Sequence, residues 1–120
     1  MEEELVELRS ETHTDLSIAK KMIQLYQSAQ SRGLDFDLKF STIKKLLHKK
    51  KCFYTKQLFE KEGLMKLSID RVDSAKGYIE GNVVACTTDI NSKKSNLTAK
   101  EIESLYIAIK LHSAIKIISK

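Results

Sequence analysis

Two short strands separated by a glycine-containing loop are the feature of this sequence that most constrains its fold. A half-buried strand is predicted over 67–72, where apolar and polar residues alternate from Leu67 to Asp70. The loop that follows contains two glycines, and a second strand is predicted over 82–86. Thr87 or Thr88 can then begin a short helix over about 88–95. The second half of the chain is therefore predicted to form a strand–loop–strand–helix unit.

Helical periodicity on both sides of this unit predicts three flanking helices. Residues 14–32, 42–50 and 98–118 each place apolar side chains at three- and four-residue spacing. Thr98 and Glu101 form a capping box at the start of the last of these helices, which supports its boundary there.

The segment over 52–59 is short, aromatic and β-prone, so we expect a strand or a knuckle. Its residues Cys52, Phe53 and Tyr54 are expected to pack against the C-terminal helix. The chain is long enough for one compact α+β domain over 1–120 and too short for two. The expected parts are a helical lead-in over 1–50, a core over 51–97 and a C-terminal helix over 98–120.

Charge is distributed unevenly along the chain. Residues 1–38 carry eight acidic and four basic side chains, whereas residues 39–120 carry eight acidic and seventeen basic ones. Lysines near phosphates release condensed counterions, so the basic part suits a polyanionic partner such as nucleic acid. A solvated lysine-rich surface explains the same composition equally well, so charge alone leaves both interpretations open.

Cysteine usage and hydropathy indicate the compartment. Cys52 and Cys86 are too few for a disulfide scaffold and lack CxxC spacing, which is typical of a reducing environment. No stretch approaches the roughly 20 apolar residues that cross a bilayer, and the acidic first residues do not resemble a signal peptide. We therefore expect a cytoplasmic protein.

The strand–loop–strand–helix unit resembles the core of the HNH (ββα-metal) endonuclease family. Its central stretch is similar to the pattern DRID…KGY…GNVV of phage-type members, and the helix that follows is similar to their N..K helix. The resemblance covers about residues 20–110. The matching segments are Asp70-Arg71-Val72-Asp73, Lys76-Gly77-Tyr78, Gly81-Asn82-Val83-Val84 and Asn91-Ser92-Lys93-Lys94.

This resemblance implies a site on the hairpin and the short helix. In the family, a strand carboxylate and a helix Asn or His bind one divalent cation such as Mg²⁺, and the corresponding residues are Asp70 and Asn91. Asn82 corresponds to the asparagine that orients the loop and the general base, although a purely loop-pinning amide is an equally good interpretation. The expected nucleic-acid contacts are Arg71, Lys76, Lys93 and Lys94.

The general-base histidine of the family is replaced here by Arg71. A guanidinium cannot accept a proton near neutral pH, but it can hold phosphate oxygens bidentately. The three histidines, His13, His48 and His112, all lie outside the hairpin and are expected to be ordinary surface or core residues.

The zinc knuckles of many family members are missing as well. Thr55 stands where a second cysteine would follow Cys52, and Thr87 and Ile90 occupy the second knuckle. We expect no structural zinc.

Three functions are consistent with the sequence. The first is a metal-dependent DNA endonuclease or nickase of HNH type, with Asp73 or a metal-bound water as the base. The second is a catalytically degenerate HNH fold that binds nucleic acid. The nucleic acid expected in both cases is double-stranded DNA, and the contacts expected for the second are Lys76, Lys93, Lys94 and the lysines over 44–56. The third is a phage protein, located in the host cytoplasm, that binds a host protein through its acidic N-terminal segment.

Overall fold

The computed structural model describes residues 14–118, so the expectations for His13 and the acidic N-terminal segment lie outside the described residues. The elements, in chain order, are α2 (Asp15–Ser31), β1 (Phe36–Asp37), α3 (Phe40–Leu47), η1 (Gly63–Met65), β2 (Leu67–Arg71), β3 (Tyr78–Ile79), β4 (Val83–Thr87), α4 (Thr88–Lys94) and α5 (Ala99–Ile118).

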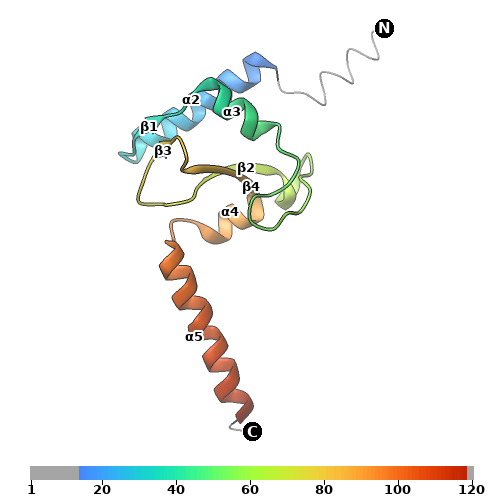
Figure 1. Cartoon of the computed structure of the whole chain (residues 1–120), viewed down its shortest axis with the longest axis vertical. Coiled ribbons are helices and arrows are strands. Elements are labelled where there is room, and N and C mark those ends of the chain that lie inside the picture. The colour runs from blue at the N-terminus through green and yellow to red at the C-terminus, as the bar shows by residue number, and fades with distance from the viewer. Residues whose placement is uncertain (1–13, 119–120) are drawn as a thin grey trace.

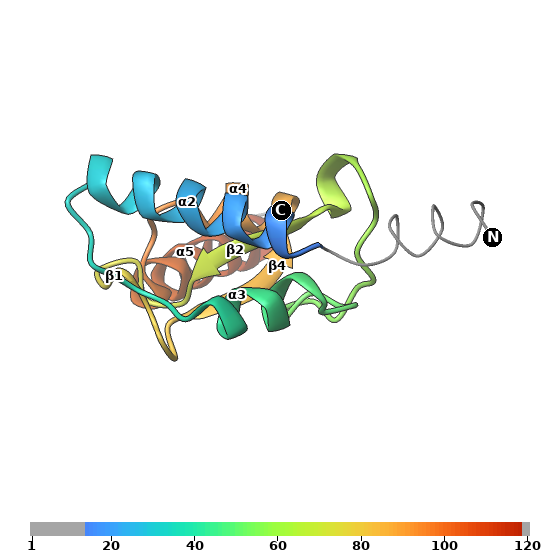
Figure 2. The ribbon, with the colours of Figure 1, turned by 90° about the horizontal axis from the view of Figure 1, so that it is seen from above.

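A ββα unit forms the centre of the molecule. Strands β2 and β4 pair antiparallel, with Asp70 opposite Val84, and α4 follows β4 directly. Helices α2 and α3 pack on each other at one side of this hairpin, and α4 contacts its two strands at the other (Figure 1). From above, α2 and α3 lie side by side in front of the hairpin, as one layer (Figure 2). The predicted hairpin and short helix are confirmed, with boundaries within one residue.

Helix α2 supplies much of the core. Thr14 caps it by accepting a 3.2 Å hydrogen bond from Ser17 N, and Gly33 follows its end with φ +65°. Of the apolar residues expected to share one face, Ile18, Leu25 and Ala29 are buried, whereas Tyr26 is half exposed. These three residues join the apolar side chains of α3 and the hairpin in one cluster.

Helix α3 begins two residues earlier than expected because a distant side chain caps it. The carboxylate of Glu80 accepts hydrogen bonds from Lys39 N at 3.0 Å and from Thr42 Oγ1 at 2.6 Å. Lys39 itself, the N-cap residue, makes no side-chain cap. The loop after β3 therefore supplies the start signal for a helix about 40 residues upstream.

Strands β1 and β3 form a second, parallel pair that the sequence did not predict. Gly77 lies directly against the backbone of Asp35, where an added Cβ would overlap the carbonyl oxygen, and Tyr78 N donates to that oxygen at 2.9 Å. This close approach holds the β2–β3 loop against the segment that links α2 and α3.

The segment over 52–59 forms a knuckle rather than a strand. Cys52 N donates to Gln57 O at 2.8 Å and Lys56 adopts φ +65°, which closes a tight turn. Phe53 N donates to Ala85 O at 2.8 Å, so the knuckle is attached to β4. The sequence predicted either a strand or a knuckle here, and the structure has the knuckle.

Helix α5 does not pack against the knuckle, so the expected contact with Cys52, Phe53 and Tyr54 is wrong. Every α5 residue over 99–115 is exposed, and the helix projects away from the other elements (Figure 1). When its sequence is placed on a helix of 3.6 residues per turn, the apolar residues lie on two opposite sides. No single apolar face is therefore available to pack on the body of the molecule, which is formed by α2, α3 and the hairpin. Within the described residues, neither α5 nor any other helix is long and apolar enough to cross a membrane.

Candidate functional site

A cavity of about 320 Å³ lies where β2, β3 and α4 meet the end of α2. It therefore sits on the ββα unit that the sequence singled out. Its lining is mostly polar and includes two arginines and one carboxylate. The residues that line it are Arg32, Ile69, Asp70, Arg71, Tyr78, Asn91, Ser92, Ser95 and Asn96.

Asp70 is buried and already has two partners. Its Oδ2 atom accepts a hydrogen bond from the Tyr54 hydroxyl at 2.8 Å and lies 3.2 Å from Lys94 Nζ. The side chains of Asp70 and Lys94 are only 6% and 10% exposed, so solvent screens this ion pair weakly. Lys94 Nζ also donates to Arg71 O at 2.8 Å, which ties α4 to β2.

Asn91 also lines the cavity, and its amide nitrogen donates to Ser68 Oγ at 2.7 Å. The amide oxygen of Asn91 and the carboxylate of Asp70 are the kinds of ligand that a hard divalent cation takes. However, Lys94 and Tyr54 occupy the carboxylate, and residues 14–118 contain no group of three or more His, Cys, Asp or Glu side chains that could hold a metal ion. The residue types fit a metal, but their arrangement in this structure does not.

Arg71 lies in the cavity wall with its guanidinium partly engaged. Its Nη1 donates to Ser74 O at 2.6 Å and to Lys76 O at 3.0 Å, whereas Nη2 reaches Asn96 Oδ1 only at 3.5 Å. Arg71 thus fixes the β2–β3 loop through Nη1, and Nη2 is the atom better placed to turn to a phosphate oxygen.

Arg32 reaches the cavity from the end of α2. Its Nη2 donates to the Tyr78 hydroxyl at 2.7 Å, and its guanidinium carbon lies 5.8 Å from the centre of the Tyr78 ring. Arg71 lies 5.6 Å from the same ring. Tyr78 therefore holds two guanidinium groups near one cavity, which concentrates positive charge there.

Asn82 is buried and pins the β2–β3 loop. Its Oδ1 accepts from Asp73 N at 2.9 Å, while Nδ2 donates to Gly77 O at 2.9 Å and to Asp73 O at 3.1 Å. Neither Asn82 nor Asp73 lines the cavity. These contacts correspond to the loop-pinning interpretation of Asn82.

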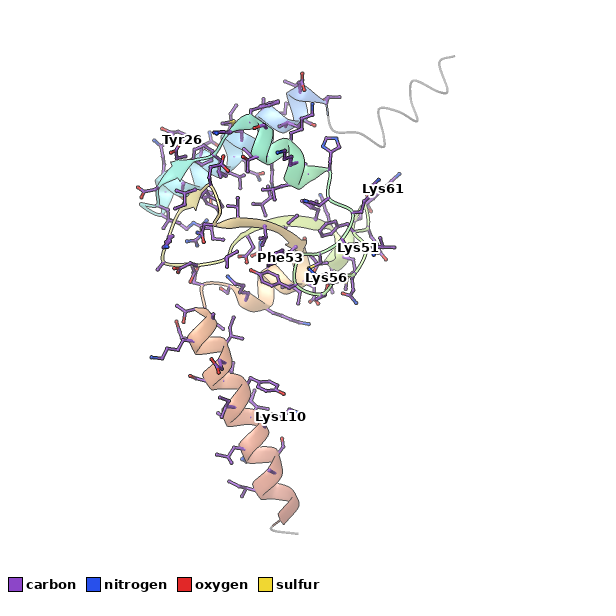
Figure 3. All side chains as sticks on the ribbon, in the orientation of Figure 1. Tyr26, Lys51, Phe53, Lys56, Lys61 and Lys110 are labelled. Carbon is purple, nitrogen blue, oxygen red and sulfur yellow. The ribbon has the colours of Figure 1, made fainter. Side chains whose placement is uncertain are left out.

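The predicted nucleic-acid lysines occupy different environments. Lys94 points inward to Asp70, whereas Lys93 is 72% exposed and pairs with Asp89 at 3.1 Å. Lys76 is exposed on the loop and does not line the cavity. Further lysines, including Lys51, Lys56 and Lys61, lie around the knuckle at one end of the body (Figure 3).

The two histidines within the described residues, His48 and His112, do not line the cavity. His48 Nδ1 lies 2.7 Å from Lys44 O at the end of α3, and His112 is exposed on α5. Neither lines the cavity, so neither replaces the missing base histidine in this structure.

The Tyr54 hydroxyl and the Cys86 thiol, which lie near Asp70, both have raised pKa values. Burial, followed by the hydrogen bond to Asp70, raises the pKa of Tyr54 well above its usual range. Burial and the nearby Asp70 charge raise the pKa of the Cys86 thiol to about 12. Tyr54 therefore remains a hydrogen-bond donor to Asp70 at neutral pH and does not act as a base.

Sequence reasoning missed several residues of this site. Arg32 had no local signal, because only its contact with Tyr78, which lies 46 residues farther along the chain, holds it at the cavity. Tyr54 was expected to contact the C-terminal helix and instead holds Asp70. The remaining cavity residues that were not predicted are Ile69, Tyr78, Ser92, Ser95 and Asn96.

A phage protein is similar in sequence to this chain. The chain is 38% identical over 87 residues to an uncharacterized 29.0 kDa protein encoded in the dda–modA intergenic region of Enterobacteria phage T4. The match covers 71% of this chain and 35% of the T4 protein, so the chain spans about a third of the length of that relative. No protein-family model matches the chain.

A solved nuclease is similar in structure. The rare-cutting HNH restriction endonuclease PacI, described as perturbing its DNA, superposes with a TM-score of 0.56 over 77% of this chain and 75% of its own. The two sequences are 22% identical. The chain therefore has an α+β, HNH-like ββα fold with flanking helices, as the sequence resemblance implied.

Proposed function

We propose that this protein binds the phosphodiester backbone of nucleic acid, most simply double-stranded DNA, in the cavity beside β2 and α4. The observation that carries this proposal is the charge of the cavity. Arg32 and Arg71 both line it, and its one carboxylate, Asp70, is already neutralised by Lys94. A polar concavity with net positive charge suits a phosphate group.

Two further observations support this proposal. The cavity lies on the ββα unit of a fold that a DNA-cutting endonuclease shares. Additional exposed lysines lie around the knuckle, where they can contact phosphates farther along a strand (Figure 3). Lys76 and Lys93 stay predictions as phosphate contacts, as does the host-protein partner.

The test is DNA affinity measured over a series of salt concentrations, for example by fluorescence anisotropy with a short duplex. Arg32→Gln should weaken binding and reduce the salt slope by about 0.9 per lost phosphate contact. Lys110→Gln is the matched control, because it removes one positive charge from α5, far from the cavity (Figure 3).

Each outcome of this comparison has a definite meaning. A loss confined to Arg32→Gln supports backbone binding in the cavity. Equal losses in both variants would mean that net charge alone attracts DNA, and no loss in either would remove the cavity from DNA binding.

Metal-dependent cleavage of the bound strand is the second candidate function. It is favoured by the fold shared with PacI and by the position of Asp70 and Asn91 in one cavity. It requires the Lys94–Asp70 pair to open, since no other carboxylate lines the cavity.

Conversion of supercoiled plasmid to the nicked form, with Mg²⁺, Mn²⁺ or Ni²⁺ against EDTA, tests this candidate. Nicking that EDTA and Asp70→Ala both abolish would support a nuclease. DNA binding without nicking in the presence of any of these metals would reject cleavage and retain backbone binding as the proposed function.

A further inference from the structure

The ion pair between Lys94 and Asp70 differs from an ordinary surface pair. Lys94 Nζ lies 3.2 Å from Asp70 Oδ2 and 3.4 Å from Oδ1, so it contacts both oxygens of the carboxylate. The neighbouring pair on the same helix, Lys93–Asp89, is largely exposed on the lysine side. Of these two lysines, Lys94 is the one positioned as a buried counter-ion.

Lys94 places its ammonium against oxygen atoms of β2. Its ammonium contacts the carboxylate of Asp70 and the carbonyl oxygen of Arg71, two kinds of oxygen ligand that divalent cations also take. Tyr54, which belongs to the knuckle, donates a hydrogen bond to the same carboxylate. A divalent ion at Asp70 would have to displace the ammonium of Lys94.

We infer that Lys94 is a tethered cation that occupies the place of a divalent metal at Asp70 and thereby keeps the free protein from binding one. This inference concerns the same site as the proposed function but does not rest on DNA binding. Removing the ammonium while keeping Asp70 should free that carboxylate and Arg71 O for a divalent ion. The ligand is a hard divalent cation, with Asp70 and Arg71 O as its first ligands and the amide oxygen of Asn91, which lines the same cavity, as a further one.

The experiment is Mn²⁺ titration of the free protein, without DNA, followed by the loss of the aqueous Mn²⁺ electron paramagnetic resonance signal. The wild type should show no saturable site up to about millimolar Mn²⁺, whereas Lys94→Met should gain one site at least about tenfold tighter, because an unpaired Asp70 charge attracts the ion. Lys93→Met is the matched control, since it removes the same charge one position away, and it should gain no comparable site. Adding Asp70→Asn to Lys94→Met should abolish the new site.

Lys94→Met leaves a buried carboxylate without its counter-ion, which can lower stability. Lys94→Gln keeps a hydrogen-bond donor for that carboxylate, and circular dichroism selects whichever variant is folded. A wild type that binds Mn²⁺ as tightly as the folded Lys94 variant would overturn the inference. A folded Lys94 variant that gains no site would overturn it as well. Because DNA is absent throughout, failure here leaves the backbone-binding proposal intact.

Discussion

The body of the molecule and helix α5 use apolar residues in opposite ways. In the body, residues from α2, α3 and the hairpin form one buried cluster, with Ile18 and Ile43 completely inaccessible. In α5, residues of the same kind are exposed, including Leu105 at 53% and Ile109 at 57%. Helical periodicity predicts helices in both regions, whereas the burial of a helix depends on whether its apolar residues share one side.

The largest expected difference concerns matched isoleucines. Ile43→Ala should lower the free energy of unfolding by about 2–5 kcal/mol, because it leaves a cavity in the core. Ile109→Ala should change it by no more than about 0.5 kcal/mol, since the side chain is exposed on a helix where alanine is favourable. Urea denaturation measures both values. Similar losses in the two variants would show that α5 is packed in solution, which would contradict the difference in burial between the body and α5.

The pinned loop offers a smaller effect within the body. Asn82→Ala should cost about 1–3 kcal/mol, because it leaves Asp73 N and Gly77 O without their buried partner. Asn96→Ala is the control, as Asn96 is exposed and its side chain accepts only a 3.5 Å contact from Arg71. Thermal unfolding should separate the two variants clearly, and equal melting temperatures would show that Asn82 does not hold the loop.

The capping box tests whether α5 is stabilised locally. Thr98 Oγ1 accepts from Glu101 N at 3.1 Å, and Glu101 Oε1 accepts from Thr98 N at 3.3 Å. Thr98→Ala should cost about 0.5–2 kcal/mol of helix stability and speed amide exchange in the first turns of α5. Exchange rates in α2 and β4 should not change. Faster exchange throughout the body would mean that the two regions unfold together.

The smallest effect is expected at the cap that Glu80 provides for α3. Hydrogen bonds from Thr42 and then from Lys39 lower the pKa of Glu80, so the charged form is the one that stabilises the fold. This contribution is present at neutral pH and is lost as the pH falls through that lowered pKa. Glu80→Gln should therefore be slightly less stable than the wild type at pH 7, and the difference should shrink in acid. A difference that grows in acid would contradict the assigned hydrogen bonds.

Much of the fold was accessible from local sequence signals. Three local signals are each encoded within a few neighbouring residues: the alternation of Leu67 to Asp70 in β2, the threonine that precedes α4 and the capping box at Thr98. Such signals act through backbone hydrogen bonds close in the chain, so their elements appear within one or two residues of the predicted positions. Asp70 and Asn91 were also predicted, by resemblance, and the structure places both in one cavity.

Tertiary packing decided the rest. Arg32 and Tyr54 reach the site from segments far away in the sequence, and Glu80 caps a helix about 40 residues upstream. The sequence determined that Lys94 is a basic residue on a short helix, but only the packing of α4 on β2 turned it inward to Asp70. The physical reason is that an ion pair depends on the distance and burial of its partners, and neither quantity is encoded locally along the chain.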